Sequence, residues 1–270
     1  MSASKVVRAP DFSSVTELPR QGATRMQMSM LRTRYGWAAQ YAAGKYVLEV
    51  ACGAGLGLVW LAQRARRVAA GDIDQENCRI AREACCGQAN IRVEWMDALE
   101  LPFEARSFDL VVLFEALYYL TDVPRFLAEA RRVLRPGGAL LISTVNCEWS
   151  GFHPSFLYTR YWNAAELLQA LKDGGFEPRL GAGFPEPDGS WRGLRRRLKR
   201  VASHWGCIPR SMRAKAILKR LFYGRLELIP PRLEAYAPSP PEATESIVPV
   251  DGGTDLARYR TLYCEARSSR

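Results

Sequence analysis

The chain has 270 residues, of which 48% are hydrophobic and 24% are charged. This is the composition of a globular protein, and it excludes a disordered or fibrous chain. No apolar run reaches the length of a membrane-spanning helix, and the polar first residues lack the apolar core of a secretory signal, so we expect a cytoplasmic protein. The 7 cysteines contain no C-x-x-C spacing and only 2 histidines accompany them, which predicts free thiols and no metal site.

Short apolar runs alternate with longer amphipathic segments in the first half of the chain. The apolar runs predict buried strands at Tyr46–Ala51, Arg67–Asp72, Ile91–Trp95, Asp109–Phe114 and Ala139–Val145. The segments between them predict helices at Leu56–Arg66, Gln75–Gly87 and Val123–Leu134, the last stopped by Pro136-Gly137-Gly138. Because strands that alternate with helices form right-handed crossovers, the pattern predicts an α/β fold with a doubly wound, mostly parallel sheet.

Further elements flank this core. We expect one helix over Met26–Ala42 and another that begins at Asn163, where Glu166 completes a capping box, and ends at Gly174-Gly175. Strands are predicted at Phe176–Gly183 and Arg258–Ala266. The chain then divides into an N-terminal arm and helix (1–44), a Rossmann-like core (45–183), a basic and Pro-rich insertion (184–257) and a final core strand with a tail (258–270).

A glycine turn follows the first predicted core strand. Its spacing is G-x-G-x-G over Gly53, Gly55 and Gly57, and Glu49 lies four residues ahead of it. Glycine is favoured where the backbone turns sharply and a ligand approaches without a Cβ in between. A dinucleotide turn would place its third glycine at the position of Leu58, so the spacing disfavours a nicotinamide-dependent oxidoreductase.

Acidic residues follow three further strands of the predicted sheet. Asp72 ends the second strand, Asp97 follows the third and Glu115 follows the fourth. The carboxyl ends of parallel strands meet at one edge of the sheet, and open α/β sheets bind their ligands there. A carboxylate at the position of Asp72 can accept hydrogen bonds from both hydroxyls of a ribose.

These motifs, in this order, resemble the class I S-adenosylmethionine-dependent methyltransferases, and within them the small-molecule group typified by quinone-biosynthesis enzymes. The resemblance covers Val47–Thr144, and it includes Gly71-Asp72-Ile73-Asp74, Asp97-Ala98 and Arg132-Val133-Leu134-Arg135-Pro136-Gly137-Gly138. It implies a sheet of about seven strands whose last strand is antiparallel. It also implies that S-adenosylmethionine is the cofactor and assigns its binding to Glu49, Gly53, Gly55, Asp72, Ile73, Asp97 and Ala98.

The residues that act on the acceptor are less clearly marked. Methyl transfer needs alignment and exclusion of water, and it needs a base only where the acceptor loses a proton. The candidate bases are Glu115, in an apolar run that favours a raised pKa, and His153, after the fifth strand. For both, a purely structural role remains open. Tyr118, Tyr119 and Asn146 are candidates for the acceptor pocket. The candidates for the cofactor's carboxylate are Arg32, Arg34 and Tyr35.

The net charge of +10 comes from one segment. The stretch Trp191–Arg225 holds 12 of the 38 basic residues and no acid, which leaves 26 basic against 28 acidic residues elsewhere. Its apolar residues recur at intervals of three and four, as in an amphipathic helix: Trp191, Leu194, Leu198, Val201 and Trp205. Three interpretations remain open, namely a lid over the acceptor site, a helix on an anionic membrane surface, and an RNA contact, the last being the least favoured.

The sequence therefore predicts an S-adenosylmethionine-dependent methyltransferase that acts on a small molecule. The favoured reaction is O-methylation of a sugar or glycan intermediate or of a natural product. The alternative is a non-catalytic protein that binds the cofactor and docks on an anionic membrane or on RNA through the basic segment. Nucleic acid is the less favoured partner, because the segment holds no recognised RNA-binding motif.

Overall fold

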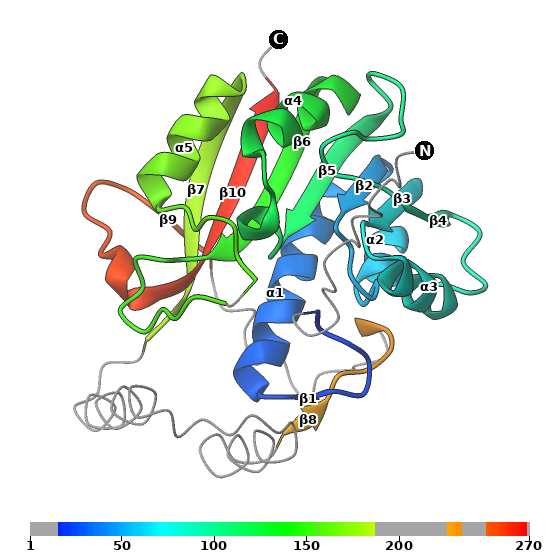
Figure 1. The fold of residues 1–270 in the computed structure, drawn as a ribbon, viewed down its shortest axis with the longest axis horizontal. Coiled ribbons are helices and arrows are strands. Elements are labelled where there is room, and N and C mark those ends of the chain that lie inside the picture. Colours follow the sequence, from blue (N-terminus) through cyan, green and yellow to red (C-terminus); the bar gives the residue numbers. More distant parts are fainter. Residues whose placement is uncertain (1–15, 156, 187–225, 234–246, 269–270) are drawn as a thin grey trace, which may run out of the picture.

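The computed structural model describes residues 16–155, 157–186, 226–233 and 247–268. A β-sheet lies at its centre (Figure 1). Eight strands lie in the order β4-β3-β2-β5-β6-β10-β7-β9. Their bounds are β2 Tyr46–Val50, β3 Arg67–Asp72, β4 Ile91–Trp95, β5 Phe108–Phe114, β6 Leu134–Val145, β7 Phe176–Pro185, β9 Val248–Pro249 and β10 Tyr259–Ser268. Strands β2 to β6 pair in parallel, whereas β10 runs antiparallel to both β6 and β7. The predicted doubly wound Rossmann-like sheet is confirmed, and the short strand β9 extends it.

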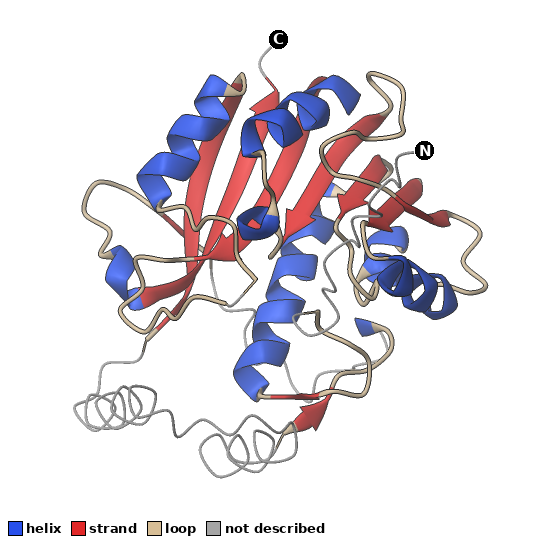
Figure 2. Cartoon of the chain, viewed as in Figure 1, coloured by secondary structure: helices blue, strands red, loops and turns tan. Residues whose placement is uncertain are grey.

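Helices cover both faces of this sheet (Figure 2). Helices α1 (Arg25–Tyr41), α2 (Leu58–Ala62) and α3 (Gln75–Ala84) pack on one face, and α4 (Val123–Val133) and α5 (Ala164–Asp173) on the other. Successive strand residues point to opposite faces, so Val47 joins the first core and its neighbour Leu48 the second. Both side chains have no exposed surface, which is why these strands are apolar on both sides.

The boundary between α4 and β6 differs from the expected one. Helix α4 ends at Val133 and strand β6 begins directly after it, at Leu134. The motif Pro136-Gly137-Gly138 therefore lies inside β6 and does not terminate the helix. The register against β5 shifts between Phe108 and Leu110, and the regular ladder resumes at Ala139. Gly137 has a positive φ of 77°, which a glycine adopts without strain. The motif therefore forms an irregular start to a strand.

The helix ends follow the capping signals in the sequence. Asn163 caps α5, with Glu166 completing the predicted box, and Asp74 caps α3 through the backbone amides of Glu76 and Asn77. Helix α2 is shorter than predicted, because Gly57 is its N-cap and the chain turns after Ala62. Among the described residues, no helix combines the length and the apolar character needed to cross a membrane.

A second, two-stranded sheet joins distant parts of the chain. Strands β1 (Gly22–Ala23) and β8 (Glu227–Leu228) pair in antiparallel fashion beside the start of α1. The segment then continues across the molecule, where the amide of Leu233 donates to the carbonyl oxygen of Leu56 at 3.0 Å. The predicted insertion thus contributes β8 and β9 to the fold, whereas its basic part, Trp191–Arg225, lies outside the described residues.

Candidate cofactor and acceptor site

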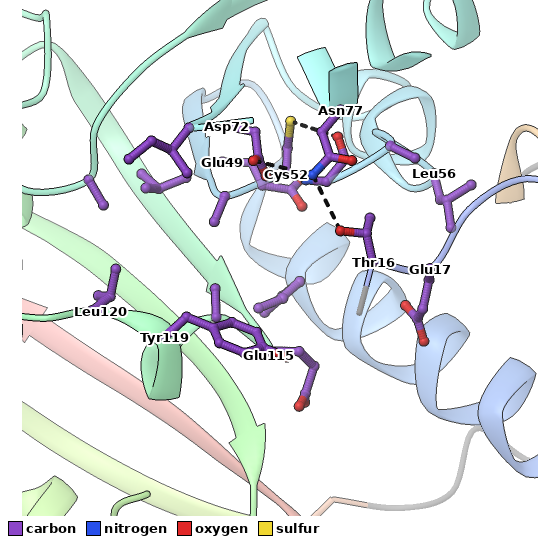
Figure 3. Close-up of a pocket in the computed structure, with 18 of the residues that line it drawn as sticks. Thr16, Glu17, Glu49, Cys52, Leu56, Asp72, Asn77, Glu115, Tyr119 and Leu120 are labelled. Atoms are coloured by element: carbon purple, nitrogen blue, oxygen red, sulfur yellow. Dashed lines mark hydrogen bonds between the residues drawn. The ribbon is translucent and has the colours of Figure 1, made fainter. Parts of the chain in front are cut away.

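A pocket of about 640 Å³ lies at the carboxyl ends of the parallel strands (Figure 3). Asp72 ends β3, Asp97 follows β4 and Glu115 follows β5, and all three residues line this pocket. Figure 3 shows Glu49 and Asp72 at one end and Glu115 with Tyr119 at the other. The strand ends therefore meet at one crevice, as the sequence predicted.

Three hydrogen bonds hold Asp72 at the end of the pocket beside the glycine turn. Its Oδ2 accepts from the amide of Gly53 at 2.9 Å, and its Oδ1 accepts from the amide of Asp74 at 2.9 Å and from Asn77 Nδ2 at 3.3 Å. The side chain is 6% exposed, and burial raises the pKa of its carboxyl above the ordinary value. These donors fix the orientation of the carboxylate, and its further lone pairs can still accept from a ligand.

The glycine turn places backbone, not side chains, against the pocket. Ala51 and Gly53 both have positive φ values, of 55° and 54°, and both line the pocket. Gly55 does not line it: a Cβ there would lie 2.8 Å from the Cβ of Ala81 in α3. The structure therefore places Gly55 in the packing between the turn and α3, whereas the sequence predicted that it would contact the cofactor.

Three more of the predicted cofactor residues line the same end. They are Ile73, Asp97 and Ala98, which follow β3 and β4. The Oδ1 of Asp97 accepts from the amide of Leu99 at 2.8 Å. This bond orients the side chain beside the backbone of Ala98, so a carboxylate acceptor and a main-chain amide face the same part of the pocket.

Glu49 is a buried carboxyl beneath the glycine turn. It is 1% exposed and lines the pocket, and the hydroxyl of Tyr35 donates to its Oε1 at 2.6 Å. Its Oε2 has no hydrogen-bond partner among the described residues. Burial raises the pKa of Glu49 to about 7, although the Tyr35 hydrogen bond and the charge of Arg34 oppose this rise. A buried oxygen in this state is an acceptor for a donor group on a bound ligand.

Glu115 lies at the opposite end, on a strained backbone. Its φ is 50°, a conformation that L side chains rarely adopt outside functional turns. Its carboxylate accepts from Ser143 Oγ at 3.2 Å and from the hydroxyl of Tyr118 at 3.5 Å. Burial raises the pKa of this carboxyl, and the nearby charge of Arg34 lowers it. A carboxylate with a raised pKa is suited to accept a proton near neutral pH.

Tyr118 and Tyr119 form an aromatic wall beside Glu115, and both line the pocket as predicted. Their ring centroids are 4.5 Å apart, and Tyr161 stacks on Tyr118 from behind at 5.1 Å. The amide of Thr159 donates to the carbonyl oxygen of Tyr118 at 2.8 Å. The loop after β6 thus holds this wall in place.

Two predicted site residues lie elsewhere. Asn146 is fully buried, and its Nδ2 donates to the carbonyl oxygens of Leu256 and Tyr259, both at 2.8 Å. Its role is to bind the turn before β10, not the acceptor. His153 is exposed and does not line the pocket. Other residues of the same loop contact Tyr118: the ring of Tyr161 stacks on it, and the amide of Thr159 donates to its carbonyl oxygen.

The N-terminal arm supplies residues that the sequence did not reveal. Thr16 and Glu17 line the pocket, Asn77 Nδ2 donates to Thr16 Oγ1 at 3.3 Å, and Glu17 forms an ion pair with Arg34 of α1 (Figure 3). Arg34 and Tyr35 line the pocket too, as the sequence suggested, whereas Arg32 is not among its lining residues. No local pattern marks the arm residues, because only the folded chain brings them over the crevice.

The comparisons with known proteins identify the domain. Residues 48–142 match the family model described as a methyltransferase domain. A probable S-adenosylmethionine-dependent methyltransferase from Mycolicibacterium smegmatis is 37% identical over 164 residues, which are 57% of this chain and 63% of that protein. Residues 48–142 therefore form a methyltransferase domain. S-adenosylmethionine is the cofactor named for the Mycolicibacterium relative.

Further similarities agree with this methyltransferase domain. A ubiquinone biosynthesis O-methyltransferase from Coxiella burnetii is 32% identical over 117 residues, which are 43% of this chain and 48% of that protein. The crystal structure of the YcgJ protein from Bacillus subtilis superposes with a TM-score of 0.56 at 15% identity, covering 91% of this chain and all of that one, which shows a shared fold. The chain spans 63% of the first of these sequence relatives and 48% of the second.

The described pocket fits a cationic ligand. Its lining holds five acidic residues, Glu17, Glu49, Asp72, Asp97 and Glu115, against one basic residue, Arg34. S-adenosylmethionine has a sulfonium and an ammonium group, and opposite charges within a partly desolvated site attract strongly. The unpartnered Oε2 of Glu49 provides an acceptor for such a ligand, and Gly53 lines the pocket without a side chain of its own. The residues present therefore fit the cofactor.

Proposed function

We propose that this chain transfers the methyl group of S-adenosylmethionine to a hydroxyl oxygen of a small molecule. The observation that supports it is the arrangement of the pocket, with two carboxylates for a nucleoside at one end and a partly buried Glu115 beside two tyrosines at the other. A sugar or glycan intermediate, or a natural product, presents a hydroxyl of this kind. The O-methylation named for the Coxiella relative favours oxygen as the target atom.

In this proposal the two ends of the cofactor are bound by different elements. Asp72 accepts from the ribose hydroxyls, while Asp97 and the amide of Ala98 bind the adenine edge. Glu49, through its unpartnered Oε2, accepts from the ammonium group of the methionine part. Arg34 lies between Glu17, Glu49 and Glu115. Its positive charge there favours binding of the carboxylate group of the cofactor's methionine part.

Glu115 then acts as the base. When bound, the cofactor supplies an electrophilic methyl group. Its sulfonium sulfur is the leaving group and becomes a neutral thioether when the methyl–sulfur bond breaks. The acceptor oxygen forms the new bond with its lone pair, and its proton passes to the carboxylate of Glu115. Ser143 and Tyr118 donate to that carboxylate, so they orient it before it accepts the proton. The apolar wall around it excludes water that would compete.

The decisive experiment measures cofactor binding and transfer separately. The affinity of the full chain for S-adenosylmethionine is measured by calorimetry, and labelled methyl transfer is followed in fractionated extract with mass spectrometry of the product. Asp72→Ala should weaken cofactor binding at least tenfold, because it removes the acceptor for the ribose hydroxyls. Glu115→Gln should retain cofactor binding and lose transfer to hydroxyl acceptors. Unchanged affinity in the Asp72 variant, or full transfer in the Glu115 variant, would refute the proposal.

A further inference from the structure

The charge of the pocket restricts what can bind beside the methyl group. Two of its carboxylates, Glu17 and Glu115, lie with Arg34 at the acceptor end, and Arg34 is already paired with Glu17. No lysine or histidine is among the described residues that line the pocket. Among the described residues, an anionic acceptor would therefore meet like charges with no free cation to compensate them, which costs binding energy in a partly desolvated site.

The remaining cation offers little to an acceptor. Arg34 is 8% exposed, and its Nε is buried without a hydrogen-bond partner. One of its terminal nitrogens is paired with Glu17, and in the proposed function its charge also favours the carboxylate of the cofactor's methionine part. The same charge acts on the carboxylates around it, since it lowers the pKa of both Glu49 and Glu115. With Glu17 and the cofactor's carboxylate as its partners, Arg34 is not left to bind an anionic acceptor.

The surface of the acceptor end is flat and aromatic. Tyr118 meets Tyr119 at an interplanar angle of 61° and lies nearly parallel to Tyr161, at 28°. Behind them, Phe152 packs edge-on against Tyr161 at 4.7 Å. The apolar side chains of Met30, Phe114 and Leu120 also line the pocket. A wall of stacked rings that is held by its own neighbours favours a planar apolar group over a flexible polar one.

We propose that the acceptor is an uncharged molecule that presents its hydroxyl from an aromatic ring, packed against Tyr118 and Tyr119. This narrows the proposed function and rests on it, since Glu115 is the base in both. Carboxylated and phosphorylated acceptors are excluded by the same carboxylates that favour the cationic cofactor. The Glu115 carboxylate lies next to the hydroxyl of Tyr118, so a ring on this wall brings its own hydroxyl toward the base.

A matched pair of probes tests the charge. Methyl gallate and gallate share one ring with the same hydroxyls, and they differ in that gallate has a carboxylate in place of the ester. Their binding to the full chain, saturated with S-adenosylhomocysteine, is measured by ligand-observed NMR titration. Methyl gallate should bind at least tenfold more tightly than gallate, and Glu115→Gln should narrow this ratio at least threefold by strengthening gallate binding. Equal affinity of the two probes, tighter binding of gallate, or no binding of methyl gallate would overturn the proposal.

Variants of Tyr118 test the ring. Tyr118→Ala should weaken methyl gallate at least fivefold, whereas Tyr118→Phe, which keeps the ring, should bind it within twofold of the parent chain. Methyl glucoside, which is uncharged but not aromatic, should bind more weakly than methyl gallate. If Tyr118→Ala binds methyl gallate as well as the parent chain does, the proposal is wrong. The affinity for S-adenosylhomocysteine is measured in each variant. If it is normal while the phenolic probes behave otherwise than expected, this inference fails. If S-adenosylhomocysteine itself does not bind, the proposed cofactor site fails.

Discussion

The hydroxyl of Tyr35 donates a hydrogen bond of 2.6 Å to Oε1 of Glu49, and this bond joins helix α1 to strand β2 beneath the glycine turn. Both residues are buried, at 4% and 1% exposure. A carboxyl that is taken out of water needs such a donor, because an unpaired buried charge is costly. The pair therefore links the cofactor crevice to the packing of the first core.

Tyr35→Phe should destabilise the protein and weaken cofactor binding together. The variant removes the donor to Glu49 Oε1 and leaves both carboxyl oxygens without a partner, which costs about 1–3 kcal/mol. Because the hydrogen bond lowers the pKa of Glu49, its loss also raises the fraction of neutral Glu49 near pH 7. Denaturant unfolding and calorimetry with S-adenosylmethionine measure the two effects.

Tyr41→Phe is the matched control for this variant. Tyr41 lies on the same helix, and its hydroxyl donates to Glu265 Oε2 at 2.9 Å, away from the pocket. Its loss should lower stability slightly and leave cofactor affinity unchanged. An equal loss of affinity in both variants would show that α1 acts only through its general stability.

Glu49→Gln should make the cofactor-free protein more stable at pH 8. The pKa of Glu49 is raised from 4.5 to about 7 in the fold, so the folded state binds more protons than the unfolded state across this interval. Stability therefore falls as the pH rises from about 4.5 to 7, by up to about 3 kcal/mol for this group. The variant removes this loss, and it also removes the charge that favours the cofactor's ammonium.

Denaturant unfolding at pH 4.5 and pH 8 checks the sign. The two proteins should have nearly equal stability at the lower pH, and the glutamine variant should be the more stable one at the higher pH, while its affinity for S-adenosylmethionine falls. If the variant were less stable than the parent chain at pH 8, burial of the charged Glu49 carboxylate would not destabilise the fold, and the prediction would be wrong.

Gly57→Ala should be strongly destabilising. A Cβ at Gly57 would lie 2.2 Å from the ring of Tyr35, and both residues are buried in the fold between α1 and α2. Overpacking of this kind costs about 1–3 kcal/mol, and it displaces the ring that holds Glu49. Thermal unfolding should show a clear drop in the midpoint. Gly252→Ala is the control, since no atom lies within 4 Å of its added Cβ, and it should change the midpoint little.

Much of the fold and the nucleoside end of the pocket could be predicted from local patterns. Strand ends, the glycine turn and the positions of Asp72 and Asp97 follow one another in the sequence, so their convergence follows from the parallel topology. The errors concern residues whose partners are remote. Asn146 binds the backbone of Leu256 and Tyr259, more than 100 residues away, and Glu17, which lines the pocket, pairs with Arg34 of α1. Such contacts leave no periodic signal in the chain.

The basic segment Trp191–Arg225 yields the last prediction, since its sequence predicts an amphipathic helix with a cationic face. Each Lys or Arg near an anionic membrane contributes about 1 kcal/mol, and an apolar stripe that carries tryptophan adds to this. The chain should therefore bind anionic phosphatidylglycerol vesicles in flotation assays and should bind zwitterionic vesicles weakly. Leu198→Asp should abolish flotation, because it places a charge in the predicted stripe. Leu228→Asp, at a site that is 68% exposed outside this segment, should float as the parent chain does. Equal binding to both kinds of vesicle, or salt-sensitive retention by RNA without flotation, would exclude the membrane interpretation.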